Sequence, residues 1–519
     1  MKVNVGDILT RRARRDPNLE AVVDWATGRR FTYAEWNDRA NRAGDLLRRL
    51  GIGKGDRIAI LAKNGPEFME AFFGCSKLGI VVVPLNWRLV ADELEFILAD
   101  SGAVALLFDD DFVDMAGELH SRGDRTALRH FVQIGTRPLV DFAQRYDDLL
   151  AAASGAEPII AATDSDLLHI MYTSGTTGLP KGAVHTQASG YWASVNAALT
   201  FDVRPADRYQ VCLPMFHIGA LFPAQSLVHC GATAVIMREF DPIESWKLLE
   251  TERCTGTLLV PAMLTFMLSV YEQCKPDHST LRWAQSGAAP VPVTTIQTYT
   301  DLGIPISQLY GLTETYAVAT CSTAEQSIER PGTAGLPYFL ADVRVTDDDL
   351  RDVPPGTQGE ILVRGPFLMQ GYHQRPDASE QALWVDPADG TTWLRTGDAG
   401  MQDADGFLYV QDRIKDMLIS GGENIYPAEI ENVILAHPGV KEVAVIGVPS
   451  AKWGESPLAI VVKADADLTD TDVMGFCDGK LGRFKLPKAV VFTDEIPRNP
   501  SGKVLKRVLR EQFPETAPE

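Results

Sequence analysis

The chain has 519 residues, of which 45% are hydrophobic and 23% are charged, and its formal net charge is −20. This length exceeds the roughly 100–200 residues of a typical domain, so we expect more than one domain. The acidic excess argues against nucleic acid as a partner, because such binding depends on neutralising phosphates. The seven cysteines are scattered and form no CxxC pair. This excludes a disulfide framework and indicates reduced thiols in a cytoplasmic protein.

The amino terminus carries several arginines and lacks the apolar run of a signal peptide. No stretch reaches the roughly 20 apolar residues that a transmembrane helix needs. A peripheral membrane contact and a homodimer both remain open from the sequence alone.

The first part of the chain alternates helical and strand patterns. Residues 32–50 have helical apolar spacing, and Thr32 with Glu35 forms a capping-box pattern. Further alternation predicts strands at 57–62, 80–84, 103–108, 210–213, 233–237 and 257–260, and helices at 67–77 and 93–100. Such alternation predicts a parallel sheet with helices on its faces, and therefore an α/β fold.

The pattern changes twice farther along the chain. After residue 332, short strands between Pro/Gly turns predict a β-rich subdomain. After residue 413, helices at 427–436 and 470–481 and strands at 442–447, 458–463 and 489–492 predict a small α+β domain. We therefore expect a large N-terminal domain at 1–412, with its β-rich part at 332–412, a hinge at 413–416 and a mobile C-terminal domain at 417–519.

The strongest motif, at 172–182, reads Tyr-Thr-Ser-Gly-Thr-Thr-Gly-Leu-Pro-Lys-Gly and follows a strand pattern. Its glycines allow close backbone approach to a ligand, and its hydroxyls, amides and Lys181 can bind phosphate oxygens. It is not a Walker A loop, because Pro180 precedes the lysine and Gly182 follows it. The alternative, a surface linker, rarely follows a buried strand.

This loop resembles the phosphate-binding signature of the adenylate-forming superfamily, which includes acyl-CoA synthetases, beetle luciferases and peptide-synthetase adenylation domains. Further signatures follow in the family's order, at 213–217 (Leu-Pro-Met-Phe-His), 287–290 (Gly-Ala-Ala-Pro), 310–315 (Tyr-Gly-Leu-Thr-Glu-Thr), 395–398 (Arg-Thr-Gly-Asp), 412–416 (Asp-Arg-Ile-Lys-Asp) and 497–503 (Pro-Arg-Asn-Pro-Ser-Gly-Lys). The resemblance covers nearly the whole chain and is strongest to bacterial fatty-acyl-CoA synthetases. It implies ATP, Mg²⁺ and coenzyme A as reaction partners.

The resemblance implies an extended ATP site. Glu314 and Thr173 would hold Mg²⁺, which takes one or two protein oxygens beside phosphate and water. Asp398 would accept the ribose hydroxyls and Arg413 would bond the ribose from the other side. Taken alone, Glu314 could be a solvated carboxylate and Asp398 an Asx turn. The remaining ATP-binding residues implied are Ser174, Gly175, Thr176, Thr177, Gly178, Lys181, Gly287, Ala288, Ala289, Gln308, Tyr310, Gly311 and Thr313.

Lys503 matches the family's catalytic lysine, which would bridge the substrate carboxylate and the α-phosphate. For coenzyme A, Gly421 and Gly422 match the passage for the pantetheine arm. Trp453 and Phe484 resemble positions that contact its nucleotide, although either could be a core residue. Lys415 matches the family's hinge, about which the C-terminal domain would rotate between the two half-reactions.

The acyl pocket is expected around Phe216, His217, Gly219, Ala220 and Gly311. The apolar stretches at 212–227 and 258–268 favour a medium- or long-chain fatty acid as the substrate of an acyl-CoA synthetase. The alternatives are an aromatic acid of the benzoate or cinnamate type, loading of a carrier protein, a luciferase-like oxygenase, and a non-catalytic acyl- or nucleotide-binding protein. The last of these is disfavoured because Glu314 and Lys503 are both present.

Overall fold

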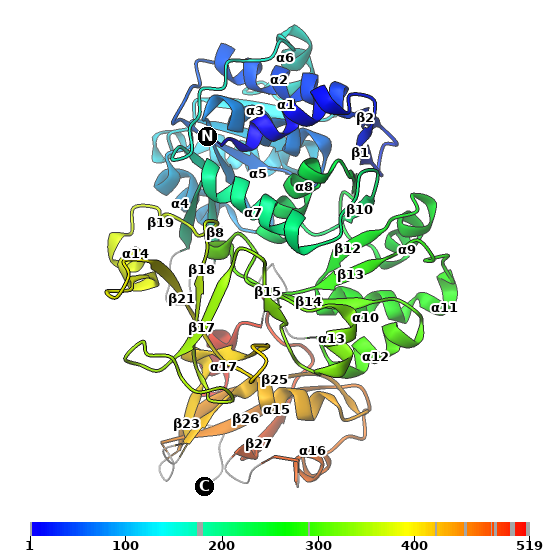
Figure 1. The fold of residues 1–519 in the computed structure, drawn as a ribbon, viewed down its shortest axis with the longest axis vertical. Helices are drawn as coiled ribbons and strands as arrows, with labels where there is room; N and C mark the ends of the chain where they lie inside the picture. The colour runs from blue at the N-terminus through cyan, green and yellow to red at the C-terminus, as the bar shows by residue number, and fades with distance from the viewer. Residues whose placement is uncertain are drawn as a thin grey trace.

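The computed structural model describes residues 3–173, 180–288, 291–420, 423–450, 454–478, 480–481, 485–498 and 504–514. Within these residues the chain forms four β-sheets, and its colours in Figure 1 run from the amino-terminal helices at the top to a small orange and red body at the bottom. Among the described residues, no helix has both the length and the apolar character needed to cross a membrane.

An eight-stranded sheet is built mainly from the first third of the chain. Its order is β19-β9-β8-β4-β3-β5-β6-β7, parallel from β8 to β7 and antiparallel at the β8–β9–β19 edge. The strands are β3 (Arg57–Leu61), β4 (Val81–Pro84), β5 (Ala105–Asp109), β6 (His130–Ile134), β7 (Gln144–Arg145), β8 (Leu167–Thr173), β9 (Lys181–Thr186) and β19 (Gly371–Tyr372).

A nine-stranded sheet lies beside it, with the order β16-β15-β14-β13-β12-β10-β11-β1-β2. The strands from β14 to β1 are parallel, and the two edges are antiparallel. The strands are β1 (Glu20–Asp24), β2 (Arg30–Thr32), β10 (Arg208–Val211), β11 (Thr233–Ile236), β12 (Gly256–Leu259), β13 (Trp283–Ser286), β14 (Ile306–Tyr310), β15 (Thr320–Cys321) and β16 (Leu336–Pro337).

Helices fill the space between these sheets and cover their outer faces. On β3, Ile58 and Ile60 join the core shared with the nine-stranded sheet, whereas Ala59 and Leu61 face the opposite core, as period-two alternation requires. The shared core contains α1 (Val5–Arg15), α2 (Tyr33–Arg49), α3 (Pro66–Leu78), α7 (Gln187–Thr200) and α8 (Ile218–Cys230). The outer faces carry α4 (Ala91–Ser101) and α5 (Val113–Ser121) on one side, and α9 (Pro242–Thr251), α10 (Pro261–Ser269) and α12 (Val293–Asp301) on the other.

Shorter elements complete this part of the chain. They are α6 (Tyr146–Ala152), α11 (Tyr271–Cys274), α13 (Ala324–Glu329), α14 (Pro376–Ala382) and the 3-10 turns η1 (Asp110–Phe112), η2 (Gly123–Arg125) and η3 (Thr313–Thr315). The predicted capping box is confirmed, since Thr32 accepts from the backbone of Glu35 and the Glu35 side chain bonds back. The predicted strands and helices of the α/β region are confirmed within a few residues at their ends.

The β-rich segment forms an antiparallel sheet of its own. Its strands are β17 (Asp342–Thr346), β18 (Gly359–Arg364), β20 (Leu383–Val385), β21 (Thr392–Gln402) and β22 (Leu408–Arg413), in the order β17-β18-β21-β20, with β22 also pairing β21. Register places Asp398 opposite Arg413 at the end of the β21–β22 hairpin. The 3-10 turn η4 (Ile414–Asp416) follows β22 directly.

The C-terminal part is a small α/β body around a second five-stranded sheet. Its order is β24-β23-β26-β25, with β27 also pairing β26. Its elements are β23 (Leu418–Ser420), β24 (Glu423–Ile425), α15 (Pro427–Leu435), β25 (Val440–Ser450), β26 (Gly454–Lys463), α16 (Asp470–Cys477), β27 (Ala489–Phe492) and α17 (Lys506–Gln512). The helix predicted over 470–481 ends early, at Cys477. The glycines at 479 and 482 give the following sequence low helix propensity.

Charged side chains join the C-terminal body to β22. Lys506 on α17 lies 2.9 Å from Glu431 on α15 and 3.5 Å from Asp412 on β22. The same Asp412 carboxylate accepts a hydrogen bond from the backbone of Ala428, and Arg510 pairs with Asp416 at 3.2 Å. Burial lowers the pKa of Lys506, but the two carboxylates more than offset it and the pKa is raised.

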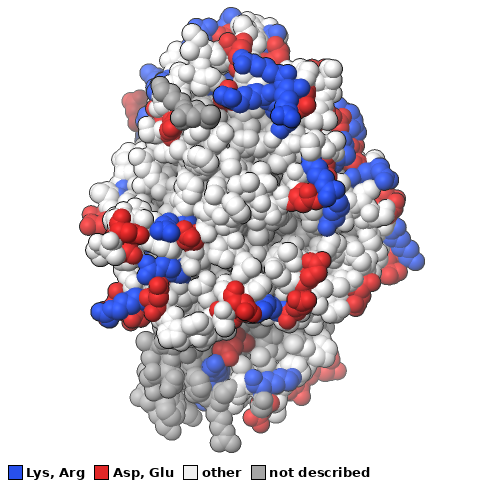
Figure 2. Space-filling view, in the orientation of Figure 1, with Lys and Arg blue, Asp and Glu red and all other residues white. Residues whose placement is uncertain are grey.

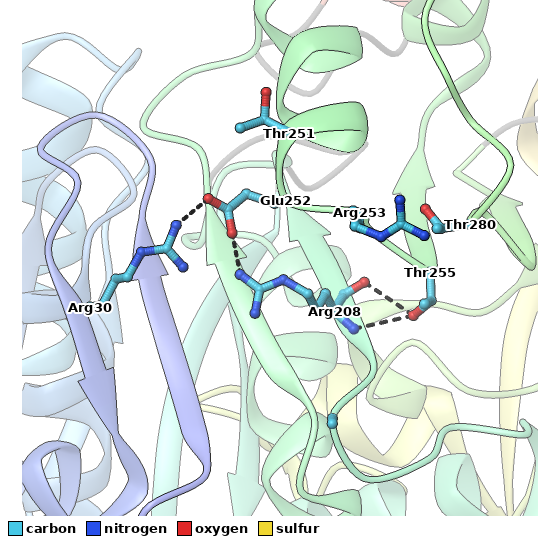
Figure 3. Close-up of a pocket in the computed structure, with 8 residues that line it drawn as sticks. Arg30, Arg208, Thr251, Glu252, Arg253, Thr255 and Thr280 are labelled. Carbon is cyan, nitrogen blue, oxygen red and sulfur yellow. Dashed lines mark hydrogen bonds and ion pairs between the residues drawn. The ribbon is translucent and has the colours of Figure 1, made fainter.

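A surface cleft of about 550 Å³ lies where β10 and β12 begin (Figure 3). Figure 3 shows Glu252 between the guanidinium groups of Arg30 and Arg208, each of which it pairs with. Both arginines also pair with Glu20. Because ligands of parallel α/β sheets bind outside the opposite, carboxyl ends of the strands, we interpret this network as a structural tie between the β1–β2 hairpin and the sheet.

A buried ion pair stabilises the packing of α2 on α3. The Glu70 carboxylate on α3 is fully buried and accepts from Arg39 of α2 at 2.5 and 3.1 Å and from the hydroxyl of Tyr146. Burial raises the pKa of Glu70, and Arg39 only partly opposes this. Removing one partner of such a pair costs about 3–5 kcal/mol, because the other charge stays buried without compensation.

We therefore expect Arg39→Ala to lower the thermal midpoint clearly, and more at pH 7 than at pH 5. The folded protein binds a proton at Glu70 more readily than the unfolded chain, so stability increases as the pH falls towards the unfolded pKa of about 4.3. Arg11→Ala, which removes an exposed pair with Asp7, should change stability by less than about 1 kcal/mol. Equal effects of the two variants, or a loss for Arg39→Ala that does not depend on pH, would contradict this interpretation.

Candidate active site

The first half of the site is a buried carboxylate shared by two sheets. Tyr310 ends β14, and its hydroxyl donates to Asp398 Oδ2 at 2.7 Å. Arg413 at the end of β22 lies 2.7 Å from Asp398 Oδ1 and donates to the carbonyl of Thr396 at 3.2 Å. The Asp398 side chain is only 6% exposed, so these two partners balance its charge. Carboxylate oxygens accept hydrogen bonds from hydroxyl groups, which is the kind of group that a ribose presents.

Electrostatics in this cluster keep Arg413 charged. Burial lowers its pKa, but the Asp398 carboxylate, together with the acidic groups around it, more than offsets this and the pKa is raised. For Tyr310, burial and then the same carboxylate raise the phenol's pKa well above its ordinary value. The phenol therefore stays protonated and donates, which leaves Asp398 as the acceptor in this cluster.

The second half of the site is the β8–β9 hairpin. Register pairs Thr173, the last residue of β8, with Lys181, the first of β9. The Thr173 hydroxyl donates to the carbonyl of Lys181 at 3.3 Å. The predicted phosphate loop connects these two residues, so the strands present both of its ends at the carboxyl edge of the sheet.

Glu314 connects the hairpin with the end of β14. Its Oε1 atom accepts the hydroxyl of Tyr372 at 2.7 Å. Tyr372 lies on β19, which pairs with β9, and its ring lies 5.3 Å from the Lys181 ammonium. Burial, and then the Glu314 carboxylate, raise the pKa of Tyr372. The donor set of one carboxylate and the hydroxyl of Thr173 fits Mg²⁺, which is completed by phosphate and water oxygens.

Backbone geometry sets the position of Glu314. A Cβ on Gly311 would lie 2.4 Å from the carbonyl of Ala317, so only glycine allows this close approach. Tyr316 and Ala317 adopt positive φ values of 55° and 65°. The carbonyl of Thr313 faces the buried imidazole of His185 at 2.7 Å. The segment between β14 and β15 is thereby folded back into one tight turn.

The Gly287–Ala288 segment follows β13 beside β14. A Cβ on Gly287 would meet the carbonyl of Leu309 at 3.1 Å, and Ala288 has a positive φ of 71°. The buried amide of Gln308 accepts from the backbone of Val291 and donates to the carbonyl of Thr333. Gln308 therefore holds backbone segments around the site, and contact with ATP stays a prediction for it.

The predicted acyl residues lie where α8 begins. Phe216 is buried against Trp87, and its ring lies 4.4 Å from that of His217, the N-cap residue of α8, in a tilted arrangement. Burial, and then the charge of Arg88, lower the pKa of His217 to about 4. Its Nε2 atom is buried and has no hydrogen-bond partner among the described residues. Gly219 and Ala220 line a narrow void between α8 and the strands β10 and β12.

Several predicted residues lie outside the described residues, and their roles stay predictions. They are Ser174, Gly175, Thr176, Thr177, Gly178, Ala289, Gly421, Gly422, Trp453, Phe484, Lys503 and the side chain of Lys415. The structure adds two residues that the sequence analysis missed, Tyr372 and His185. Their contacts join strands distant in the chain, and no local motif indicates them.

Figure 2 shows that the face of Figure 1 is largely uncharged at its centre, with basic and acidic residues intermixed around its rim. Among the described residues on this face, basic side chains lie next to acidic ones, unlike the continuous basic surface that nucleic acid requires. The small-molecule site described above is the stronger candidate for function.

The chain is similar to known proteins both in its family signatures and over its whole length. The family described as AMP-binding enzyme matches residues 9–373, and the AMP-binding enzyme C-terminal domain matches residues 429–503. The long-chain-fatty-acid–CoA ligase FadD13 of Mycobacterium tuberculosis is 42% identical over 99% of both chains. A feruloyl-CoA synthase of Amycolatopsis sp. is 38% identical over 98% of this chain and 99% of its own.

A solved structure shares the fold throughout. It is o-succinylbenzoate coenzyme A synthetase of Bacillus subtilis in complex with ATP and a magnesium ion, with 32% identity, a TM-score of 0.87 and coverage of 98% of this chain and 100% of the other. The predicted arrangement of a large α/β part and a small C-terminal α/β body is confirmed. The chain therefore belongs to the AMP-binding enzyme family, the adenylate-forming group that its motifs resemble.

Proposed function

We propose that this AMP-binding enzyme is an acyl-CoA synthetase. It adenylates a medium- or long-chain fatty acid with ATP, releasing pyrophosphate, and then transfers the acyl group to the thiol of coenzyme A, releasing AMP. Whole-chain similarity to a long-chain-fatty-acid–CoA ligase supports the reaction.

One observation carries the proposal. The segment from Tyr310 to Glu314 leads from the carboxylate cluster of Asp398 and Arg413 to the Tyr372–Lys181 cluster. Tyr310, which bonds the acceptor Asp398, therefore lies four residues before Glu314, whose partner Tyr372 has its ring beside Lys181. This spacing suits a nucleotide whose ribose meets Asp398 and whose phosphates meet Thr173, Lys181 and Glu314.

In the first half-reaction, an oxygen of the substrate carboxylate attacks the α-phosphorus of ATP, and the bond to the β-phosphate oxygen breaks. Lys181 and the hydroxyls of the loop stabilise the charge that accumulates on pyrophosphate. Mg²⁺, when held by Glu314 and Thr173, supplies further neutralisation of that charge. Lys503 bridges the carboxylate and the α-phosphate as the bond forms.

In the second half-reaction, the thiolate of coenzyme A attacks the acyl carbonyl and AMP leaves. The sequence predicts that Gly421 and Gly422 then line the thiol's approach, with Trp453 and Phe484 at the nucleotide end. The segment 413–416 serves as the hinge, with Lys415 at its centre, between an N-terminal domain at 1–412 and a C-terminal domain at 417–519. Rotation there would separate Lys506 from Asp412, so this contact belongs to one of the two domain arrangements.

His217 lines the acyl pocket beside the reacting carboxylate. Its depressed pKa keeps the imidazole neutral at pH 7, and its partnerless Nε2 is available to a substrate oxygen. The void beside Gly219 and Ala220 is lined mainly by apolar and small residues, which favours an alkyl chain. An aromatic acid is the second candidate, because a feruloyl-CoA synthase is similar over nearly the whole chain.

We also place the enzyme in the cytoplasm, because all seven cysteines are free thiols, as suits a reducing compartment. A homodimer or a peripheral contact with lipid is a further proposal. Leu199 and Phe339 expose 53% and 72% of their surface. The backbone N–H of Phe339 donates to the hydroxyl of Thr200, the residue after Leu199, so the two exposed apolar residues lie on either side of this hydrogen bond. Gel filtration and vesicle sedimentation would separate these two roles.

The substrate class is tested by pyrophosphate release across acids from acetate to C18, with benzoate and cinnamates, each with and without coenzyme A. We expect a maximum among the C8–C18 fatty acids, with acyl-CoA formed only when coenzyme A is added. A maximum on aromatic acids would keep the mechanism and replace the substrate. Absence of pyrophosphate with every acid would favour a non-catalytic binding protein.

The role of Lys503 is tested by separating the half-reactions. Lys503→Ala should slow acid-dependent pyrophosphate release by about 100-fold or more, because it removes the charge at the α-phosphate. Conversion of supplied acyl-AMP and coenzyme A should stay near the wild-type rate. Arg507→Ala, which removes an exposed side chain paired with Glu511, is the matched control and should affect neither step. Equal losses in both half-reactions of Lys503→Ala would refute the role.

The role of Tyr372 is tested by Tyr372→Phe. This change removes the hydroxyl that donates to Glu314 but keeps the ring that faces Lys181. A freed Glu314 should hold Mg²⁺ less well, and we expect the KM for Mg²⁺-ATP to rise about threefold to tenfold while the KM for the acid stays unchanged. A Mg²⁺ titration that matches wild type would count against Glu314 as the metal ligand.

A further inference from the structure

Three neighbouring strands of the nine-stranded sheet place Tyr209, Gly256 and Trp283 in one row. Register pairs Tyr209 with Gly256, and Gly256 with Trp283. A Cβ on Gly256 would lie 2.2 Å from the indole of Trp283, so the ring lies directly over the glycine. The rings of Tyr209 and Trp283 are 5.2 Å apart. Two large aromatic side chains therefore form a continuous floor on the face of the sheet that α8 covers.

This floor carries hydrogen-bond donors without acceptors. The Tyr209 hydroxyl and the Trp283 Nε1 atom are buried and have no partner among the described residues, and the same holds for the hydroxyl of Tyr338. Tyr338 belongs to the same buried core as Tyr209, and burial raises the pKa of its phenol well above the ordinary value. An unsatisfied buried donor costs about 1–3 kcal/mol.

Other buried tyrosines of the shared core and of the outer face do have acceptors. Tyr33 donates to the carbonyl of Ala232, Tyr299 to the carbonyl of Leu264, and Tyr316 to Gln225. Partnerless phenols are therefore exceptional among the buried tyrosines of this protein. Tyr209 and Trp283 are orphan donors on rings 5.2 Å apart, and Tyr338 is a third in the same core, so we look here for an acceptor from outside the chain.

A narrow void connects this floor with the start of α8. Its lining includes Tyr209, Leu213, Gly219, Pro223 and Leu258, and it contains no charged side chain. The void has no room for a water molecule, so water does not satisfy Tyr209 there. Tyr209 precedes Leu213 by four residues, about 13 Å along an extended strand. The floor is thus the far end of the space that begins near His217.

The part of α8 that lines the void lacks a backbone hydrogen bond, which makes it easier to displace. Pro223 lies inside α8 and cannot donate to the carbonyl four residues earlier, that of Gly219. Both residues line the void. The helix therefore lacks one hydrogen bond on the side that an entering chain would displace.

We propose that the acyl pocket ends in an oxygen-binding site made by Tyr209, Trp283 and Tyr338, and that the enzyme prefers acids whose distal part carries an uncharged oxygen, such as a hydroxyl or keto group. This inference rests on the proposed function, because it takes the void as the acyl pocket. All three residues can donate, so the recognised group is an acceptor. A second carboxylate is excluded as the preferred group, because no cation in the lining would compensate a buried charge.

The test compares decanoate with a series of hydroxydecanoates whose hydroxyl stands at carbons 6 to 10. For the wild-type protein, kcat/KM for AMP formation should be about fivefold to tenfold higher for the best hydroxy acid than for decanoate. In Tyr209→Phe, and to a lesser extent in Trp283→Phe and Tyr338→Phe, this ratio should fall towards one while the value for decanoate itself stays similar.

Thermal stability supplies a readout that is independent of activity. Removing an orphan hydroxyl leaves no acceptor unpaired, so Tyr209→Phe should have an unchanged or higher thermal midpoint. Tyr299→Phe is the matched control on the opposite face of the same sheet. It removes a satisfied hydroxyl, so it should lower the midpoint and keep the preference for hydroxy acids.

Three outcomes overturn the inference. A wild-type protein that uses decanoate at least as well as every hydroxy acid has no such site, although its AMP formation would leave the proposed function intact. A preference that survives in all three phenylalanine variants would locate oxygen recognition elsewhere. AMP formation with none of these acids would overturn the inference together with the proposed function.

Discussion

The arrangement of the site depends on the buried carboxylate of Asp398. A charge held almost out of water is tolerated only when it is paired and hydrogen-bonded, and here the partners come from two different sheets. Tyr310 approaches from β14 and Arg413 from β22. Satisfying Asp398 therefore fixes the antiparallel sheet against the carboxyl edge of the nine-stranded sheet. It also fixes the last residue of β22, directly before the turn that leads to the C-terminal body.

The other proposed site residues follow Asp398 along the carboxyl ends of the strands. Beyond Tyr310, the tight turn at Gly311 brings Glu314 to Tyr372, and Tyr372 in turn meets the hairpin of Thr173 and Lys181. The eight-stranded and nine-stranded sheets each contribute the carboxyl ends of their strands, the usual place for ligands of open α/β sheets. The same anchor lies next to Asp412, whose contacts with Lys506 and Ala428 hold the C-terminal body. In the proposed mechanism, nucleotide contacts and domain position are therefore coupled through two adjacent hairpin residues.

Some buried polar atoms without partners lie where we propose that the acyl group binds. In most of the core, buried donors are satisfied, as the networks of Glu70 and Glu314 illustrate. Some exceptions among the described residues lie along the proposed acyl space, at His217 near its start and at Tyr209 and Trp283 near its end, and others, such as Trp36 and His169, lie elsewhere. A buried donor without a partner makes the free protein less stable. A ligand that supplies the missing acceptor removes this free-energy cost when it binds.

Much of the fold follows from local sequence. The alternation around Ile58–Leu61 and the capping box at Thr32 are short-range signals, and both predicted their elements well. The motif residues Glu314, Asp398 and Arg413 were found because signatures resemble a family, and the structure brings the last two together. Tyr372, His185 and the row of Tyr209, Gly256 and Trp283 were not predictable. Their contacts depend on which strands pair, in which register, and on which atoms stay unpaired. These features involve residues far apart in the chain, so no local pattern indicates them.

The measurement that tests the central claim most directly uses a fatty acid labelled with ¹⁸O in both carboxylate oxygens. Attack of the carboxylate on the α-phosphorus transfers one of these oxygens to the phosphate of AMP, where it remains after coenzyme A takes the acyl group. Mass spectrometry of the products should find AMP with one ¹⁸O atom and pyrophosphate with none. AMP without the label, or ADP and labelled phosphate in its place, would contradict adenylate formation at this site.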